Sequence, residues 1–142
     1  EAEKRYYVVC GTTNLPETIQ GFFVKFGDGG VDIEPLTDLY KAQVFALGRH
    51  LGVPSEIIDR TPSPDTYSLP VSDKEFYFCM PYETLDLVMY AFLNGVPAAK
   101  TAEVLGMNAA QVERAWKDLE RKKAATKTLR MLPPSPTLVM KR

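Results

Sequence analysis

The sequence predicts an α/β fold over residues 1–60, followed by a helical region. Two observations indicate extended segments: the apolar run Val8-Val9-Cys10 ends at Gly11, as a buried strand does, and residues 31–36 alternate apolar with acidic side chains. A third observation indicates helices, because apolar residues recur at spacings of three and four from residue 36 to 51 and again after residue 82.

Composition is typical of a soluble globular protein. The chain has 142 residues, 45% of them hydrophobic and 25% charged, which suits one domain with a real core. It shows neither an apolar run long enough to span a membrane nor a signal peptide, so we expect a cytoplasmic protein without a membrane partner. Cys10 and Cys79 lack metal-ligand spacing, which predicts buried, reduced thiols. Because Glu1 is not methionine and a strand-like run follows at once, we expect a fragment of a longer protein.

The first half of the chain is expected to alternate strand and helix. After the run at residues 8–10, the turn at residues 12–15 suits the carboxyl edge of a parallel strand, where α/β proteins bind ligands. A short helix is predicted from Glu17 to Phe26, followed by a glycine-rich loop at residues 27–30. The clearest helix begins after Thr37, its expected N-cap, and ends at Gly52. A short helix from Pro54 to Ile58 closes this part.

The second half is expected to be a loop and then helices. Residues 61–81 are rich in turn formers and predict a loop or lid. Helices are predicted at 82–93, 97–105 and 108–125, and two prolines at 133–134 end regular structure. The expected units are therefore an α/β portion (1–60), a loop or lid (61–81), a helical region (82–132) and a tail (133–142).

Four side chains in the first half are candidates for ligand binding. Thr12 follows the predicted strand, and the carboxylate of Glu17 is of the type that holds Mg²⁺ beside substrate phosphates. Lys25 precedes the glycine-rich loop, where backbone N–H groups can share an anion with its ammonium group. Lys41 lies early in its helix, close to that loop in sequence. Each has an ordinary alternative: a first-turn glutamate favoured by the helix dipole, or a solvated lysine.

The order and spacing of these residues resemble the second half of ammonia-dependent NAD synthetases. The resemblance covers residues 6–63 and combines several fixed spacings. It is carried by four blocks: Gly11-Thr12-Thr13-Asn14-x-x-Glu17, Lys25-Phe26-Gly27-Asp28-Gly29-Gly30-Val31-Asp32, Leu39-x-Lys41, and Gly52-Val53-Pro54.

The resemblance implies a nucleotide-binding fold of the ATP-pyrophosphatase type, a Rossmann-like α/β fold related to adenine-nucleotide α-hydrolases. It implies that Thr12, Lys41 and Ser63 contact ATP, and that Lys41 is also catalytic. It implies that Lys25 and Asp32 contact deamido-NAD and that Glu17 binds Mg²⁺. The implied enzyme is a homodimeric ligase of NAD biosynthesis that uses deamido-NAD, ATP and ammonia.

The chain departs from the family pattern in two places. The family's Ser-Gly-Gly-x-Asp-Ser pyrophosphate loop is absent from these 142 residues, so we expect the chain alone to be inactive. Many members also carry His-Lys-Arg near two prolines, whereas here only Arg130 of that triplet precedes Pro133. Of the C-terminal contact with deamido-NAD that the resemblance implies, this chain therefore keeps only the arginine.

A different class of function stays open for the helical region. Residues 101–112 resemble a helix-turn-helix, and residues 113–142 carry nine basic and three acidic side chains, so this segment has a net charge of +6. The less favoured hypotheses are therefore nucleic-acid binding and a dimerisation module. The simpler alternative is two packed helices with a solvated basic face.

Overall fold

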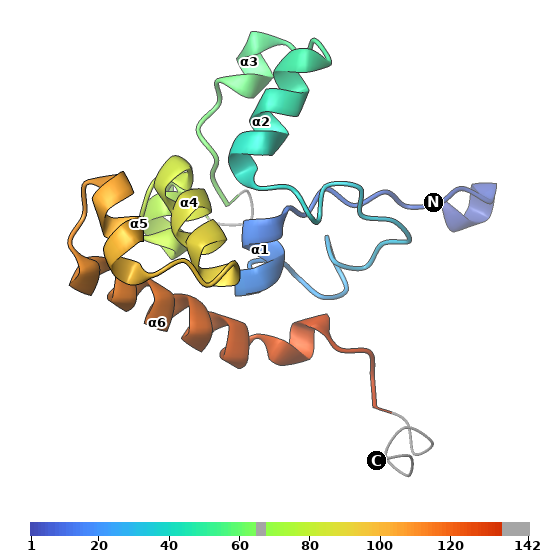
Figure 1. Cartoon of the computed structure of the whole chain (residues 1–142). Helices are drawn as coiled ribbons and strands as arrows, with labels where there is room; N and C mark the ends of the chain where they lie inside the picture. The colour runs from blue at the N-terminus through green and yellow to red at the C-terminus, as the bar shows by residue number, and fades with distance from the viewer. Residues whose placement is uncertain (65–67, 135–142) are drawn as a thin grey trace.

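The computed structural model describes residues 1–64 and 68–134, and these residues form helices joined by loops (Figure 1). Within them, α4 and α5 pack on the long helix α6, and α1 contacts α4 and α6. The pair α2 and α3 projects from this body, and α2 touches it through α4 (Figure 1). The α-helices are α1 (Leu15–Gln20), α2 (Lys41–His50), α3 (Ser55–Ile58), α4 (Tyr82–Leu93), α5 (Ala98–Leu105) and α6 (Ala109–Ala125). Three shorter turns are η1 (Glu3–Arg5), the π-helical η2 (Lys74–Phe78) and η3 (Lys127–Arg130).

The predicted strand at residues 8–10 is not formed. Residues 1–64 and 68–134 contain no strand, and the extended segments meet only in one parallel bridge between Cys10 and Ile33. The N–H of Gly11 donates to the carbonyl of Ile33 at 2.7 Å. A β-strand needs several backbone hydrogen-bonded pairs with an adjacent strand, and the described residues supply a single bridge. Val8 is consequently 67% exposed. The prediction of buried thiols is wrong for both cysteines. Cys10 is exposed because the strand that would bury it is not formed, and Cys79 is exposed because it caps η2 at the surface.

Two predicted helices begin or end elsewhere. The helix expected at residues 17–26 is α1, which stops at Gly21 because that residue adopts a left-handed φ of 72° and closes the last turn. The helix expected after Thr37 begins only at Lys41. Residues 34–39 instead form tight turns, and the Thr37 hydroxyl contacts the hydroxyl of Thr18 at 3.1 Å rather than capping a helix.

The helices of the second half agree with their predictions. α4 has the predicted bounds, and α5 and α6 each begin one residue after the predicted start, with Pro97 and Asn108 at the N-cap. The Asn108 side chain accepts from the N–H of Gln111, whose side chain accepts in return from the N–H of Asn108. Residues 65–67 of the expected loop and 135–142 of the expected tail, with the basic Lys141 and Arg142, lie outside the described residues.

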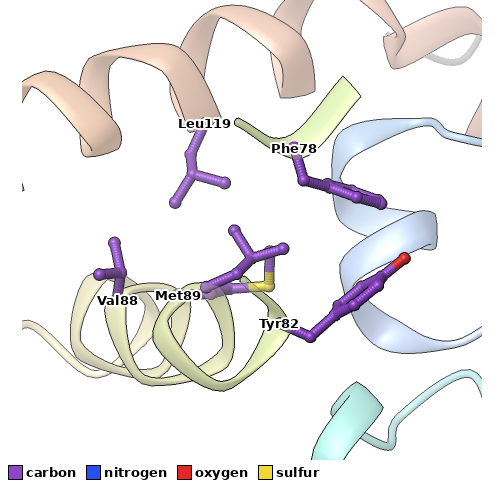
Figure 2. Close-up of a cluster of buried hydrophobic side chains, with 6 residues drawn as sticks. Phe78, Tyr82, Val88, Met89 and Leu119 are labelled. Carbon is purple, nitrogen blue, oxygen red and sulfur yellow. The ribbon is translucent and has the colours of Figure 1, made fainter. Parts of the chain in front are cut away.

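The hydrophobic core lies between α4, α6 and η2. Val88 and Met89 of α4 are fully buried and point toward Leu119 of α6 (Figure 2). Phe78 of η2 closes the core from one end. The indole N–H of Trp116 donates to the carbonyl of Val88 at 3.1 Å, so α6 is joined to α4 by a hydrogen bond as well as by packing.

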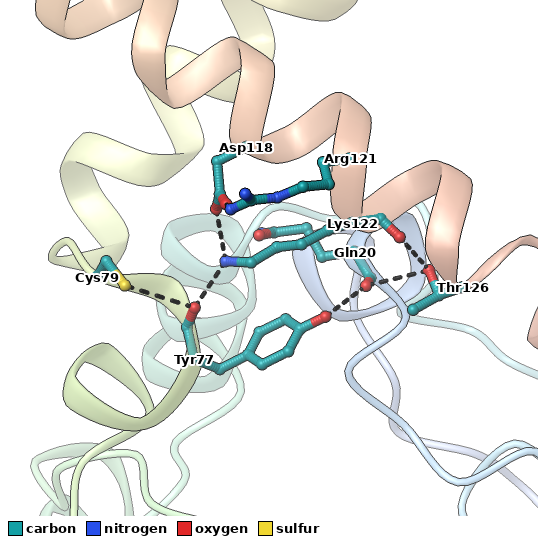
Figure 3. A network of polar contacts seen from close by, with 7 residues as sticks. All are labelled: Gln20, Tyr77, Cys79, Asp118, Arg121, Lys122 and Thr126. Atoms are coloured by element: carbon teal, nitrogen blue, oxygen red, sulfur yellow. Dashed lines mark hydrogen bonds and ion pairs between the residues drawn. The ribbon is translucent and has the colours of Figure 1, made fainter.

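A polar network joins α6 to α1 and η2 (Figure 3). The ammonium group of Lys122 donates to the carbonyl of Tyr77 at 2.6 Å and pairs with Asp118 at 2.8 Å. The hydroxyls of Tyr77 and Thr126 both donate to the carbonyl of Gln20, the last residue of α1. The C-terminal end of α1 is therefore fixed on the helical body.

Candidate functional site

An ion pair between Glu17 and Lys41 is the centre of the candidate site. The Lys41 ammonium group lies 3.2 Å from Oε1 of Glu17, and the two side chains are only 18% and 17% exposed. Oε2 of Glu17 accepts from the backbone N–H of Asn14, and the Asn14 side chain accepts from the N–H of Glu17. This capping box at the start of α1 fixes the Glu17 carboxylate, which in turn fixes the lysine.

The pair lines a cavity of about 700 Å³ that also contains Ser63. Asp28 and Asp73 contribute two further carboxyl groups to its wall. The structure thus brings together Glu17, Lys41 and Ser63, three of the residues predicted from the sequence. One ammonium group among several carboxylates suits the binding of a polyphosphate together with a cation.

A second cavity, of about 800 Å³, contains the other predicted pair, Lys25 and Asp32. Lys25 donates from its ammonium group to the carbonyls of Thr128 at 2.8 Å and Met131 at 2.6 Å. Oδ2 of Asp32 accepts from the backbone N–H of Val9. Phe23 lines both cavities, so the two cavities are adjacent.

The predicted residue Thr12 does not join either group. It is exposed, and it is absent from the described residues that line the two cavities. Its neighbour Thr13 is 4% exposed and lines the cavity that contains Lys25. The contact of Thr12 with ATP therefore stays a prediction from the resemblance.

Three residues near Lys41 were not predicted from the sequence. The ring of Tyr82 lies 5.2 Å from the Lys41 ammonium group, and its hydroxyl donates to Asp73 at 2.9 Å. Burial, reinforced by Asp73 and Glu17, raises the pKa of Tyr82, so it stays protonated and remains a donor. Asp86 accepts from the N–H of Ala42 at 2.8 Å. The available signal was two polar residues four apart on the buried face of an apolar helix.

Glu17 fits the role of a single carboxylate ligand to Mg²⁺. The described residues contain no group of three or more His, Cys, Asp or Glu side chains arranged around a common metal position. Mg²⁺ does not need such a cage, because it keeps several waters and shares one or two carboxylates with substrate phosphates. Glu17 lines the cavity, and among the described residues its Oε1 accepts a hydrogen bond from Lys41 alone, so a lone pair is available on that oxygen.

Comparison with known proteins identifies the family. A model of the NAD synthase family matches residues 1–127. The chain belongs to the NAD synthase family. It is 45% identical over 132 residues to an NH(3)-dependent NAD(+) synthetase of Rhizobium meliloti (strain 1021), an alignment that covers 93% of this chain and 40% of that relative. Thermotoga maritima has a protein of the same name that is 42% identical over 120 residues, covering 84% of this chain and 40% of that protein.

A solved structure agrees with this membership. The NMN synthetase from Francisella tularensis matches with a TM-score of 0.70 and 30% sequence identity, over 95% of this chain and 49% of that one. The chain spans about 40% of the length of the curated NAD(+) synthetases that it matches first. No helix among its described residues is long and apolar enough to cross a membrane.

Proposed function

We propose that this chain is the C-terminal part of an NAD synthetase, which forms NAD from deamido-NAD, ATP and ammonia. The observation that carries the proposal is the meeting of Glu17, Lys41 and Ser63 in one cavity, next to a second cavity with Lys25 and Asp32. We assign the first cavity to the ATP phosphates and the second to deamido-NAD. The solved neighbour is named as an NMN synthetase, whereas the relatives with higher sequence identity are named as NAD(+) synthetases. Our assignment of deamido-NAD follows the names of those more similar relatives.

The proposed reaction has two steps. An oxygen of the deamido-NAD carboxylate attacks the α-phosphorus of ATP, and the bond to pyrophosphate breaks to leave an acyl adenylate. The lone pair of ammonia then attacks the acyl carbon, AMP departs with the former carboxylate oxygen, and the nitrogen loses a proton to give the amide. Negative charge develops on phosphate oxygens in the first step, so a fixed ammonium group stabilises that transition state. We assign this role to Lys41, and Lys25 and Asp32 would orient the substrate.

The carboxylate of Glu17 would hold Mg²⁺ at the wall of the first cavity. When bound, this cation would neutralise charge on the ATP phosphates. Glu17 has a second function that needs no metal: its ion pair keeps the Lys41 ammonium group at the cavity wall in the absence of phosphate.

The wider assembly is part of the same proposal. The parallel bridge between Cys10 and Ile33 supports a Rossmann-type α/β fold in which strands elsewhere in the enzyme extend this pairing. We further propose that the part of residues 61–81 that brings Ser63 to the cavity acts as a lid, whereas η2 in the same segment belongs to the core. A cytoplasmic homodimer completes the proposal, on the basis of the family resemblance.

The hypothesis of a helix-turn-helix DNA reader has weaker support. Two apolar residues of α6 pack in the protein interior: Val112 is fully buried and Leu119 is 3% exposed. Lys122, one of the basic residues, is occupied by Asp118 and the carbonyl of Tyr77. Family membership favours the enzyme over the DNA reader.

The substitution Lys41→Ala in the full-length enzyme tests the proposed function. We expect kcat for NAD formation to fall at least tenfold, about 1.4 kcal/mol of barrier, because a fixed positive charge beside the phosphates is lost. The matched control is Lys100→Ala, since Lys100 also pairs with a glutamate, Glu103, but is 61% exposed on the surface. Equal steady-state turnover of Lys41→Ala and the control would overturn the assignment of Lys41.

A further inference from the structure

One face of α4 carries two polar residues directed at the start of α2. Tyr82 and Asp86 are one helical turn apart, and they are 9% and 6% exposed. The other buried residues of this helix are apolar: Leu85, Val88, Met89 and Ala91. A carboxyl group on such a face loses hydration, and burial accordingly raises the pKa of Asp86, although backbone N–H groups of Ala42 and Lys41 act in the opposite direction.

Asp86 holds the backbone from which Lys41 projects. Its Oδ2 accepts from the N–H of Ala42 at 2.8 Å, and Ala42 directly follows Lys41 in the first turn of α2. The N–H groups of a first turn have no partner within their own helix, and the helix dipole favours a carboxylate there. This hydrogen bond therefore fixes the N-terminus of α2, which otherwise projects from the helical body, on α4 (Figure 1).

Tyr82 holds the other end of the same lysine. Its ring centroid lies 5.2 Å from the Lys41 ammonium group, within the range of a cation–π contact. The Tyr82 hydroxyl donates to the buried carboxyl group of Asp73 at 2.9 Å, which fixes the orientation of the ring. The ammonium group thus lies close to both this ring and the carboxylate of Glu17.

We propose that Asp86 and Tyr82 are positioning residues that hold Lys41 at the cavity wall. Asp86 acts through the backbone of α2, and Tyr82 acts through the ammonium group. Neither belongs to the described residues that line the cavity of Glu17 and Ser63, so both act through Lys41 rather than on substrate. The inference rests on the proposed catalytic function of Lys41.

The test compares two variants of similar size at residue 86 in the full-length enzyme. Asp86→Asn keeps a carbonyl acceptor for the N–H of Ala42, so we expect kcat within about twofold of the wild type. Asp86→Leu keeps the volume but removes the acceptor, so we expect kcat to fall about tenfold. KM for deamido-NAD should stay unchanged in both, because that substrate is assigned to the other cavity. If circular dichroism shows that Asp86→Leu is unfolded, Asp86→Ala takes its place.

Combination with Lys41→Ala separates positioning from a general structural defect. If Asp86 acts only through Lys41, Asp86→Leu/Lys41→Ala should be no slower than Lys41→Ala alone. Tyr82→Phe, which keeps the ring, should retain more activity than Tyr82→Leu, and the Tyr82→Leu loss should also disappear in the Lys41→Ala background.

The possible results distinguish this inference from the proposed function. Wild-type turnover in Asp86→Leu, or a further tenfold loss on top of Lys41→Ala, would overturn the positioning role while leaving Lys41 catalytic. Wild-type turnover in Lys41→Ala itself would overturn the proposed function of Lys41, and the positioning inference with it.

Discussion

Replacing Gly21 with alanine tests how closely α1 approaches α6. Gly21 has a φ of 72°, a left-handed conformation that costs an L-residue about 1–2 kcal/mol. A Cβ atom built on Gly21 would also overlap the side chain of Thr126, next to the end of α6. Overpacking of this kind costs about 1–3 kcal/mol. Together these terms predict that Gly21→Ala lowers the free energy of unfolding by about 2–5 kcal/mol.

Gly106 provides a matched control for the backbone term. Its φ is 64°, but no atom lies within 4 Å of the position that a Cβ would occupy. Gly106→Ala should therefore cost only the conformational term of about 1–2 kcal/mol. The difference between the two variants isolates the contact between Gly21 and Thr126.

Equilibrium urea unfolding followed by circular dichroism measures both variants. The midpoint should fall further for Gly21→Ala than for Gly106→Ala, with an unchanged m-value if only stability changes. Thr126→Gly removes the overlapping atoms. In the Thr126→Gly background, Gly21→Ala should therefore lower the free energy of unfolding by less than it does in the wild type. Equal losses in Gly21→Ala and Gly106→Ala would refute the close approach of α1 to α6.

Two further predictions concern the helical body. Met89 is fully buried, so Met89→Ala should lower the free energy of unfolding, measured in urea, by about 2–5 kcal/mol. The control Met131→Ala, at a residue that is 41% exposed, should change it by less than about 0.5 kcal/mol. Similar losses in the two variants would contradict the placement of the core. Burial alone would raise the pKa of Asp118, but hydrogen bonds from Lys122 and Arg121 outweigh it and lower this pKa. The lowered pKa of Asp118 stabilises the folded protein at pH values above the ordinary Asp pKa of about 3.9. This stabilisation is lost as the pH falls through the lower pKa of the folded state. Asp118→Asn should therefore be less stable than the wild type at pH 7 in thermal unfolding, and a gap that does not shrink below about pH 4 would contradict the ion pair.

Local signals in the sequence were sufficient for α4, α5 and α6. Their apolar spacing, the cap at Asn108 and the stop at Gly106 all act within a few residues, so tertiary context had little to override. The strand at residues 8–10 failed because strand formation needs partners distant in sequence, and Ile33 supplies only one bridge. The N-cap at Thr37 failed because its hydroxyl has a tertiary partner, Thr18.

The candidate site shows the same division between local and distant information. Family resemblance indicated Glu17 and Lys41, but no spacing rule predicts that side chains 24 positions apart form an ion pair. Asp86 lies 44 positions from Ala42, and its place on an otherwise apolar helix face indicates burial but does not identify the partner of its carboxyl group. Positioning residues of this kind become visible only when the packing of α4 against α2 is known.

The helical region therefore acts as a scaffold for the candidate site residues of the first half. α4 holds Lys41, and carbonyls in and after η3 accept from Lys25. Arg130, which the family resemblance matches to one residue of a His-Lys-Arg triplet, donates to the carbonyl of Thr18 at 3.1 Å and to the hydroxyl of Thr126 at 2.9 Å. Its guanidinium group thus ties η3 to α1. Thr18 and Arg130 both line the second cavity, so this connection also shapes its wall.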